Sequence, residues 1–470
     1  MPQNESINLS QSFAVYAMGA NSDSVPERVF SYLKSCVADA IGLAFASRQY
    51  DYARSTAGAM QALSGGGSHP VIAGDEKLSP RDAALLNGVL IHGLDYDDTH
   101  LPSVVHCTAS ALPTVLALAY ERGVNGRELL MALLLAIEFD ARIGSAAGGK
   151  FQQRGFHPTG VVGLFGAVMA ATRLLGGTND DAVRAQGIAL STASGSMAFL
   201  DDGSWTKRLH PGWAASSAIT AAHLAMAGFQ GPSDPYSGRF GLYALFAGDA
   251  ACAEQLADVS DSPRQWALDE VAIKPYPVCH FNHAPVDAAL ALRKEYALSS
   301  HQIVSGQILL HEAQFGVVVD PIERKRAPTS EYEAKFSAPY AVAAALVKGK
   351  LGLQELEADT RADPEILALA QKLTCHHDGR SVYPKAFSGG LRLTLEDGRV
   401  LESFAEVNRG AEGRLLERDL VQEKFMQNCL LTTTADHATA IWQAVMALDQ
   451  LSDCRDFIDL IAMPTVASQE

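Results

Sequence analysis

Glycine-rich phosphate loops are missing from this sequence. Its 470 residues contain neither a GxxxxGK[ST] motif nor a GxGxxG motif after a strand pattern. Both motifs place glycine where backbone N–H groups approach a phosphate closely. No nucleotide cofactor is therefore expected. Positive charge is also scarce, because Lys and Arg total 37 against 53 Asp and Glu, a net charge of −16. This balance argues against nucleic acid and against anionic membranes as partners.

Cysteine and long apolar runs are also limited. The seven cysteines form no CxxC pair, and an odd count in a long chain indicates reduced thiols and a cytoplasmic setting. The first residues show no basic segment followed by an apolar one, as a signal peptide would. No run of about 18 apolar residues is free of both charge and glycine, so no membrane span is expected.

Aromatic residues make up only 7% of the chain, whereas Ala and Gly are abundant and 48% of residues are hydrophobic. This composition favours closely packed helices over a β-sandwich. The length allows two or three domains. The expected fold class is therefore mainly α.

The order of patterns predicts an inserted domain. Helical spacing dominates up to residue 270 and returns after 405. Between them, strand patterns are predicted at 302–313, 315–319, 389–395 and 399–407, with Glu396-Asp397-Gly398 as a hairpin turn. We therefore expect an all-helical domain from 1–270 together with 406–470, and a smaller α+β domain over 271–405.

The densest polar chemistry follows the apolar run 83–92. Asp95, Asp97, Asp98 and Thr99 come within a few residues, and His106 follows closely. Placing such groups at the end of a buried element is costly unless they are paired or face a cavity. Three interpretations remain open: solvated helix-end capping, a divalent metal bound through oxygens, or catalytic bases. The spacing is not that of an EF-hand loop.

Three later stretches add basic groups. His157 stands just before a predicted helix, where free N–H groups and the helix dipole favour an anion. Lys207, Arg208 and His210 precede another predicted helix, over 213–227, and Lys274 lies in an otherwise apolar segment. Simpler interpretations are that His157 is an ordinary loop histidine and that the 207–210 group is a solvated charged surface. Lys274 would then bury only its aliphatic stem and keep its ammonium group in water.

Taken in chain order, five stretches resemble the MmgE/PrpD family of 2-methylcitrate dehydratases and cis-aconitate decarboxylases. The stretches are HGLDYDDT at 92–99, GFHPT at 155–159, TKRLH at 206–210, KPYPVCH at 274–280 and EAKFSAPY at 333–340. The resemblance implies a large helical domain, a smaller α+β lid domain and a homodimer. It also implies a small di- or tricarboxylate substrate, with no metal or organic cofactor.

Carried over by position, the resemblance assigns roles to single residues. His106 is the expected principal acid/base, His157 a second base or carboxylate anchor, and Asp95 a group that orients a histidine or lysine. The remaining assignments are Thr99 as a hydrogen-bond donor to a carboxylate, Lys207 and Lys274 as groups that bind the substrate, with Lys274 also catalytic, and Tyr340 as a lid residue that gives or takes a proton. His210, from the same basic stretch as Lys207, is added as a further substrate-binding residue. Where family members commonly have Pro-Ser after the histidine, this sequence has Cys107-Thr108, a change that bears on the substrate more than on the reaction class.

The expected activity is that of a cofactor-independent lyase, with a 2-methylcitrate dehydratase-like hydro-lyase first. Activities like those of cis-aconitate decarboxylase or iminodisuccinate epimerase are alternatives, because the same bases serve each. A metal-dependent hydro-lyase that uses Asp95, Asp98 and histidines as ligands is a further alternative. A helical scaffold without activity is the last, and the polar stretches at element ends argue against it.

Overall fold

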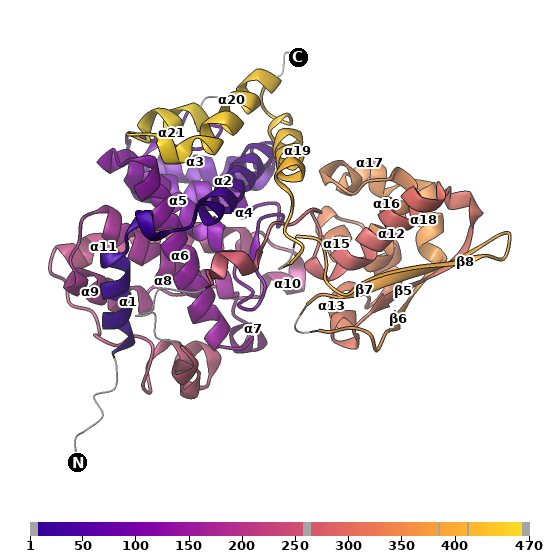
Figure 1. The fold of residues 1–470 in the computed structure, drawn as a ribbon, viewed down its shortest axis with the longest axis horizontal. Coiled ribbons are helices and arrows are strands. Elements are labelled where there is room, and N and C mark those ends of the chain that lie inside the picture. Colours follow the sequence, from indigo (N-terminus) through magenta and orange to yellow (C-terminus); the bar gives the residue numbers. More distant parts are fainter. Residues whose placement is uncertain (1–7, 257–264, 384–385, 411–412, 463–470) are drawn as a thin grey trace. The chain divides into compact units, whose positions relative to one another are not determined.

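The fold was analysed in a computed structural model that describes residues 8–256, 265–383, 386–410 and 413–462. The chain divides into two compact units. Unit 1 contains Met1–Val271 and Glu417–Glu470, and unit 2 contains Ala272–Leu416. Helices make up most of unit 1, and the larger sheet lies in unit 2 (Figure 1). The predicted class, mainly α with a smaller α+β part, is confirmed.

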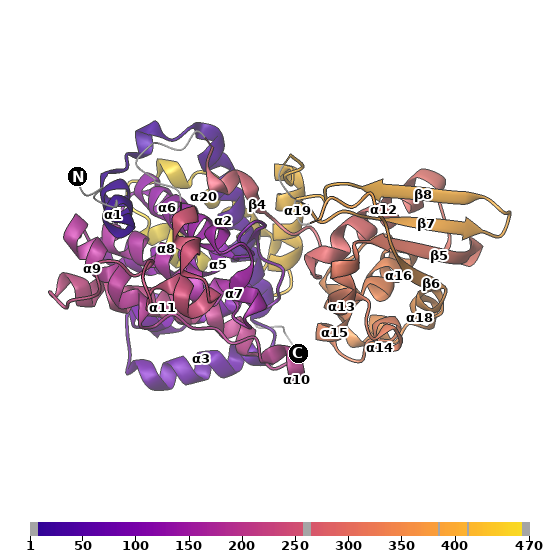
Figure 2. The same cartoon turned by 90° about the horizontal axis from the view of Figure 1, so that it is seen from below.

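Unit 1 is built around three helices that are buried on nearly every side. They are α5 (Cys107–Arg122), α6 (Gly126–Ala146) and α8 (Pro158–Leu174). Small and aliphatic side chains make this packing possible, since almost every residue of α8 is buried. Around them pack α2 (Glu27–Ser47), α4 (Pro80–His92), α9 (Asn179–Leu190) and α11 (Thr206–Met226) (Figure 2).

The remaining elements of unit 1 are shorter or peripheral. The helices are α1 (Leu9–Gly19), α3 (Asp51–Ser64), α7 (Lys150–Gln153), α10 (Phe199–Asp202), α19 (Arg418–Cys429), α20 (Ala435–Met446) and α21 (Arg455–Ile461). The short strands are β1 (His69–Pro70), β2 (Lys77–Leu78) and β3 (Thr99–His100), while β4 (Val271–Ala272) stands at the boundary of the units. Helix α2 is long and apolar enough to cross a membrane, but 89% of its most apolar window is buried inside the protein.

Helix α11 begins earlier than predicted. The sequence pattern placed its start at Trp213, after Pro211, whereas the helix already begins at Thr206 and includes Pro211. It crosses α4 at close range, because a Cβ built on Gly212 would lie 2.2 Å from the carbonyl oxygen of Leu85. Only glycine permits this approach, which brings the start of α11 close to the loop after α4.

Unit 2 contains a four-stranded sheet in the order β6-β5-β7-β8. Strands β5 (Ile303–Leu310) and β6 (Leu373–His377) are parallel, while β7 (Gly389–Leu395) pairs antiparallel with β5 and with β8 (Val400–Ala405). The hairpin predicted at 396–398 is confirmed, and Gly398 adopts the left-handed conformation there. The strand predicted at 315–319 is wrong, because Phe315–Val318 forms helix α13.

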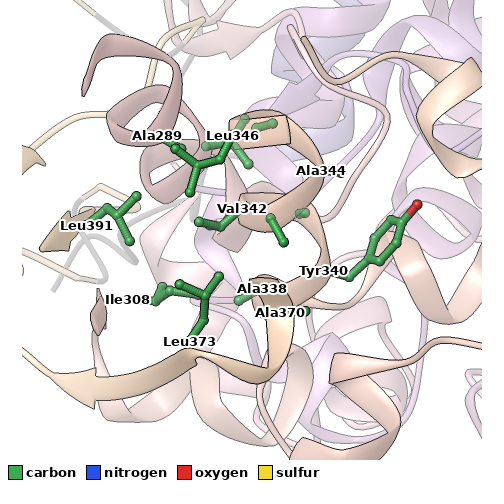
Figure 3. Close-up of a cluster of buried hydrophobic side chains, with 14 of the residues drawn as sticks. Ala289, Ile308, Ala338, Tyr340, Val342, Ala344, Leu346, Ala370, Leu373 and Leu391 are labelled. Carbon is green, nitrogen blue, oxygen red and sulfur yellow. The ribbon is translucent and has the colours of Figure 1, made fainter. Parts of the chain in front are cut away.

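The core of unit 2 lies between this sheet and three helices. Alternate residues of β7, Leu391, Leu393 and Leu395, are buried in it. The helices are α12 (His283–Tyr296), α16 (Ala338–Lys348) and α18 (Pro364–Gln371), and they contribute Ala289, Val342, Leu346 and Ala370 to the cluster (Figure 3). Short helices complete the unit: α14 (Ile322–Arg326), α15 (Glu331–Lys335) and α17 (Ala358–Arg361).

Candidate active site

In unit 1, the polar stretches found in the sequence meet where helices begin. His106 immediately precedes α5, His157 immediately precedes α8, and Lys207 lies in the first turn of α11. His92 is the last residue of α4. Helix N-termini present unpaired N–H groups and the positive end of the helix dipole, both of which favour an anion. The site is therefore suited to negatively charged groups despite the acidic chain.

Asp97 joins two imidazoles. Its carboxylate oxygens lie 3.0 and 2.9 Å from Nδ1 of His92, and Oδ2 lies 3.3 Å from Nδ1 of His106. Burial would raise the pKa of Asp97, but the two histidines outweigh it and hold the pKa well below its usual range. Asp97 is thus an ionised, buried carboxylate that accepts hydrogen bonds from both rings.

The surroundings of His106 define which ring nitrogen carries its proton. Nδ1 lies 2.9 Å from the main-chain carbonyl oxygen of Asp98 and 3.3 Å from Oγ1 of Thr99. Since a carbonyl oxygen can only accept, we assign the proton to Nδ1 and the lone pair to Nε2. Nε2 lies 4.0 Å from Oδ1 of Asp95. The backbone N–H of His106 donates to Oγ1 of Thr159 at 3.1 Å, which anchors the residue to α8.

The carboxylate of Asp95 lies beside Nε2 of His106, and Lys207 pairs with this carboxylate. Asp95 adopts a left-handed backbone conformation, with φ of 53°, and its Oδ2 accepts from Nζ of Lys207 at 2.7 Å. Arg208 donates to the carbonyl oxygen of Gly93 at 2.7 Å, so two consecutive residues of α11 hold the loop after α4. The side chains of Lys207 and Asp95 keep 15% and 14% of their surface exposed. A cation is therefore fixed near His106 and still reaches solvent.

His157 and His210 form a second pair. Their Nδ1 atoms lie 3.0 Å apart, so one ring donates a proton and the other accepts it. Burial, together with Lys207 and the other imidazoles, lowers the pKa of His157 well below its usual value. Burial, His92 and Lys207 lower the pKa of His210 to about 4. Both rings are therefore neutral near pH 7 and share one proton between the facing nitrogens.

The Cys107-Thr108 pair has a structural role next to the site. The hydroxyl of Thr108 donates to a carboxylate oxygen of Asp98, and the Thr108 N–H approaches the other at 3.4 Å. Burial raises the pKa of Asp98 to about 7, partly offset by Thr108. The side chain of Asp98 thus bonds to α5 while its backbone oxygen holds His106. Burial also raises the pKa of the Cys107 thiol, so Cys107 is not an activated nucleophile.

The structure brings six of the predicted site residues together in unit 1: Asp95, Thr99, His106, His157, Lys207 and His210. The other two, Lys274 and Tyr340, belong to unit 2, where both are buried. In Figure 3 the Tyr340 ring points away from the other hydrophobic side chains that are drawn. Its hydroxyl donates to the Glu355 carbonyl oxygen at 2.5 Å. That hydroxyl is engaged within unit 2, so the structure gives no support to its predicted proton transfer.

His92 and Asp97 were missed as site residues. Both lie in the 92–99 stretch, but His92 was interpreted as the end of an apolar helix and Asp97 as one of several equivalent acids. The signal that could have found them is the spacing of five residues between a histidine that ends a helix and a carboxylate in the following loop. Within the described residues, His92, His106 and His157 could together hold a metal ion, as could Asp95, Asp97 and His106.

Known proteins match both parts of the chain. The MmgE/PrpD N-terminal domain matches residues 11–255 and the MmgE/PrpD C-terminal domain matches residues 276–450. Human cis-aconitate decarboxylase is 28% identical over 473 residues, covering 97% of this chain and 95% of that protein. The cis-aconitate decarboxylase of Aspergillus terreus (strain NIH 2624 / FGSC A1156) is 25% identical, with 96% and 95% covered. The 2-methylcitrate dehydratase of Cupriavidus necator is 27% identical, with 75% of each chain covered. Because the two domains together account for most of its length, the chain belongs to the MmgE/PrpD family.

Proposed function

We propose that this enzyme is a lyase that acts on a small di- or tricarboxylate by moving a proton at a carbon next to a carboxylate. The observation that supports the proposal most directly is the setting of His106. Its Nδ1 proton is directed to Asp98 and Asp97, and its Nε2 lone pair lies beside the Asp95–Lys207 pair. An imidazole with a fixed tautomer next to a fixed cation suits general acid–base catalysis near neutral pH.

In a dehydration, Nε2 of His106 would take the proton from carbon. The electron pair of that C–H bond would move toward the adjacent carboxylate and then form the double bond as hydroxide leaves. The leaving oxygen would take a proton and depart as water, and the imidazolium formed at His106 would carry that proton. Lys207 and the three helix N-termini would hold the substrate carboxylates, since fixed charge directed at the developing negative charge is usually the largest catalytic effect.

In a decarboxylation, the carbon–carboxylate bond would break and CO₂ would leave without the electron pair. The pair would remain on the carbon framework, and a protonated imidazole would deliver a proton to carbon. The same cations serve both reactions. We place cis-aconitate first among substrates, because the cis-aconitate decarboxylases match over about their whole length whereas the dehydratase matches over 75%. Dehydration of 2-methylcitrate, which the sequence alone placed first, is the second candidate.

The test is proton NMR of the purified protein in D₂O with cis-aconitate, 2-methylcitrate, citrate and iminodisuccinate supplied separately. Loss of CO₂ with deuterium in the product supports decarboxylation, and loss of water supports dehydration. Deuterium exchange without loss of either would indicate epimerisation. A His106→Asn variant, similar in shape but without the imidazole base, should show none of these. Absence of exchange and product with every compound would refute the proposal.

We also infer that the protein is a cytoplasmic homodimer. Large apolar side chains are exposed along α11, including Leu209, Trp213 and Leu224, each at least 38% exposed. Clustered apolar surface of this kind is uncommon on a monomer. Sedimentation velocity at several protein concentrations tests the dimer, and a monomer at all of them would contradict it.

A further inference from the structure

Three buried imidazoles, one of them the proposed base, lie close together in unit 1. His92, His106 and His157, called here the histidine cluster, are 1%, 5% and 5% exposed. One ring nitrogen of each lies within 4.8 Å of a ring nitrogen of the other two. Their ring centroids are 4.6 Å apart for His92 and His106, and 5.6 Å apart for His92 and His157.

Each ring of the histidine cluster is held from behind by its Nδ1 atom. His92 donates to the Asp97 carboxylate, His106 donates to the Asp98 carbonyl oxygen, and His157 faces Nδ1 of His210. Metal-binding histidines almost always have this arrangement, in which a carboxylate, carbonyl or other outer partner fixes the ring and its tautomer. With Nδ1 engaged in this way, Nε2 is the atom through which His92 or His106 would bind a ligand.

A separate observation indicates that a ligand belongs there. Nε2 of His92 is fully buried and has no hydrogen-bond partner among the described residues. Native proteins rarely leave a buried polar atom in this state, and such an atom calls for an explanation such as an ion. In a neutral ring whose Nδ1–H donates to Asp97, Nε2 carries the lone pair and can bind only a donor or a cation.

We propose that the histidine cluster binds one divalent transition-metal ion through one ring nitrogen of each histidine, with Zn²⁺ as the best fit, and that the bound ion inhibits the lyase. Zn–N bonds of about 2.0–2.1 Å place ligand nitrogens roughly 3.5 Å apart, so the rings approach one another by no more than about 1.3 Å. Asp95, whose Oδ1 lies 4.0 Å from Nε2 of His106, is a candidate fourth ligand. Three imidazoles favour Zn²⁺, Cu²⁺ or Ni²⁺ over Mg²⁺, which prefers oxygen.

The inhibition follows from the ligand set and rests on the proposed function. The metal would take the His106 Nε2 lone pair that proton transfer needs, so base and metal ligand are the same atom. The binding itself does not depend on the proposed function, because it follows from the positions of the three rings. A failure of either can therefore be recognised separately.

Binding is measured first on the full-length wild-type protein, without turnover. Equilibrium dialysis against ZnCl₂ should show one bound equivalent, and Co²⁺ should give the intense visible absorption of tetrahedral coordination. In His92→Ala the affinity for Zn²⁺ should fall at least about tenfold, as expected when a metal site is impaired. His223→Ala, an exposed histidine on the same protein, is the matched control and should bind like wild type. If His92→Ala does not fold, the Co²⁺ spectrum of the wild-type protein still tests the site.

Inhibition is measured next with whichever carboxylate the enzyme converts. Stoichiometric Zn²⁺ should abolish turnover, EDTA should restore it, and Mg²⁺ should have no effect. Absence of a bound equivalent, an octahedral Co²⁺ spectrum, or unchanged binding by folded His92→Ala would overturn the site. Activation by Zn²⁺ would overturn the inhibition and point instead to a metal-dependent lyase.

Discussion

Replacing Asp97 by Asn tests how the site fixes the tautomer of its proposed base. The substitution keeps the shape of the side chain but removes one buried charge and one acceptor oxygen. In the native protein both carboxylate oxygens face Nδ1–H of His92, and Oδ2 also faces Nδ1–H of His106. An amide carries an NH₂ donor in place of one carboxylate oxygen, and in either orientation this donor would face Nδ1–H of His92. One imidazole must therefore lose its partner or move its proton to Nε2.

The distances indicate how large the effect should be. Asp97 lies 2.9 Å from His92 but 3.3 Å from His106, and the Asp98 carbonyl oxygen still holds His106 at 2.9 Å. The tautomer of His106 is thus only partly dependent on Asp97. In a catalytic triad, where the carboxylate is the sole partner, the same change lowers kcat by about 10⁴. We expect a loss of about 10² here, the usual scale for impaired acid–base catalysis.

The assay compares kcat and KM of Asp97→Asn with those of Asp98→Asn. Asp98 is an adjacent, equally buried carboxylate whose side chain bonds to Thr108 and to neither imidazole. Its variant should lose thermal stability with a much smaller fall in kcat. In Asp97→Asn the fall should appear in kcat, with KM little changed. Wild-type kcat in Asp97→Asn, or equal losses in both variants, would refute the tautomer argument.

Three further changes test other parts of the structure. Lys207→Met should raise KM and lower kcat together in steady-state kinetics, because the fixed cation at 2.7 Å from Asp95 is lost. A change in KM alone would contradict a role for Lys207 in the reaction step. Leu391→Ala, in the fully buried core of unit 2, should cost about 2–5 kcal/mol, seen in thermal unfolding, whereas Val400→Ala, 59% exposed, should cost far less. The pKa of Asp378 is lowered to about 2, chiefly by its bond to Arg380. A carboxyl group whose pKa is lowered by folding stabilises the protein above its unfolded-state pKa, and this stability is lost as pH falls through its folded-state pKa. The difference in melting temperature between wild type and Asp378→Asn should therefore shrink from pH 5 to pH 2. A constant difference would contradict the pairing with Arg380.

The sequence was most informative where a local pattern determines the outcome. The strand patterns and the 396–398 turn predicted the β7–β8 hairpin nearly to the residue. It failed where a longer-range contact overrides the pattern. Pro211 suggested that the helix begins after it, at Trp213, but α11 begins seven residues earlier, at Thr206, and packs on α4 through Gly212. Strand β6 was not predicted, because its five residues pair in parallel with β5, about sixty residues away.

The site shows the same division. Its residue types and their places at helix starts could be predicted from the sequence, because Pro158 after His157 and the polar run after α4 are local signals. The partners could not be predicted. Whether Asp95 or Asp97 contacts His106 depends on a left-handed turn at Asp95, and the role of His92 depends on the register of α4. These are matters of side-chain direction, on which sequence spacing carries no information.

The net charge of −16 makes one last prediction about how a polycarboxylate reaches this site. The positive groups, Lys207 and the helix N-termini, act only at short range, and Asp95 already pairs with Lys207 at 2.7 Å. At a distance the substrate meets a repulsive field, which reaches about 30 Å at 0.01 M salt but only about 10 Å at 0.1 M. Raising salt over this range should therefore increase kcat/KM, and more for a tricarboxylate than for a dicarboxylate. A fall in kcat/KM with salt would mean that the positive groups outweigh the overall charge even at long range, as in enzymes that steer their substrates.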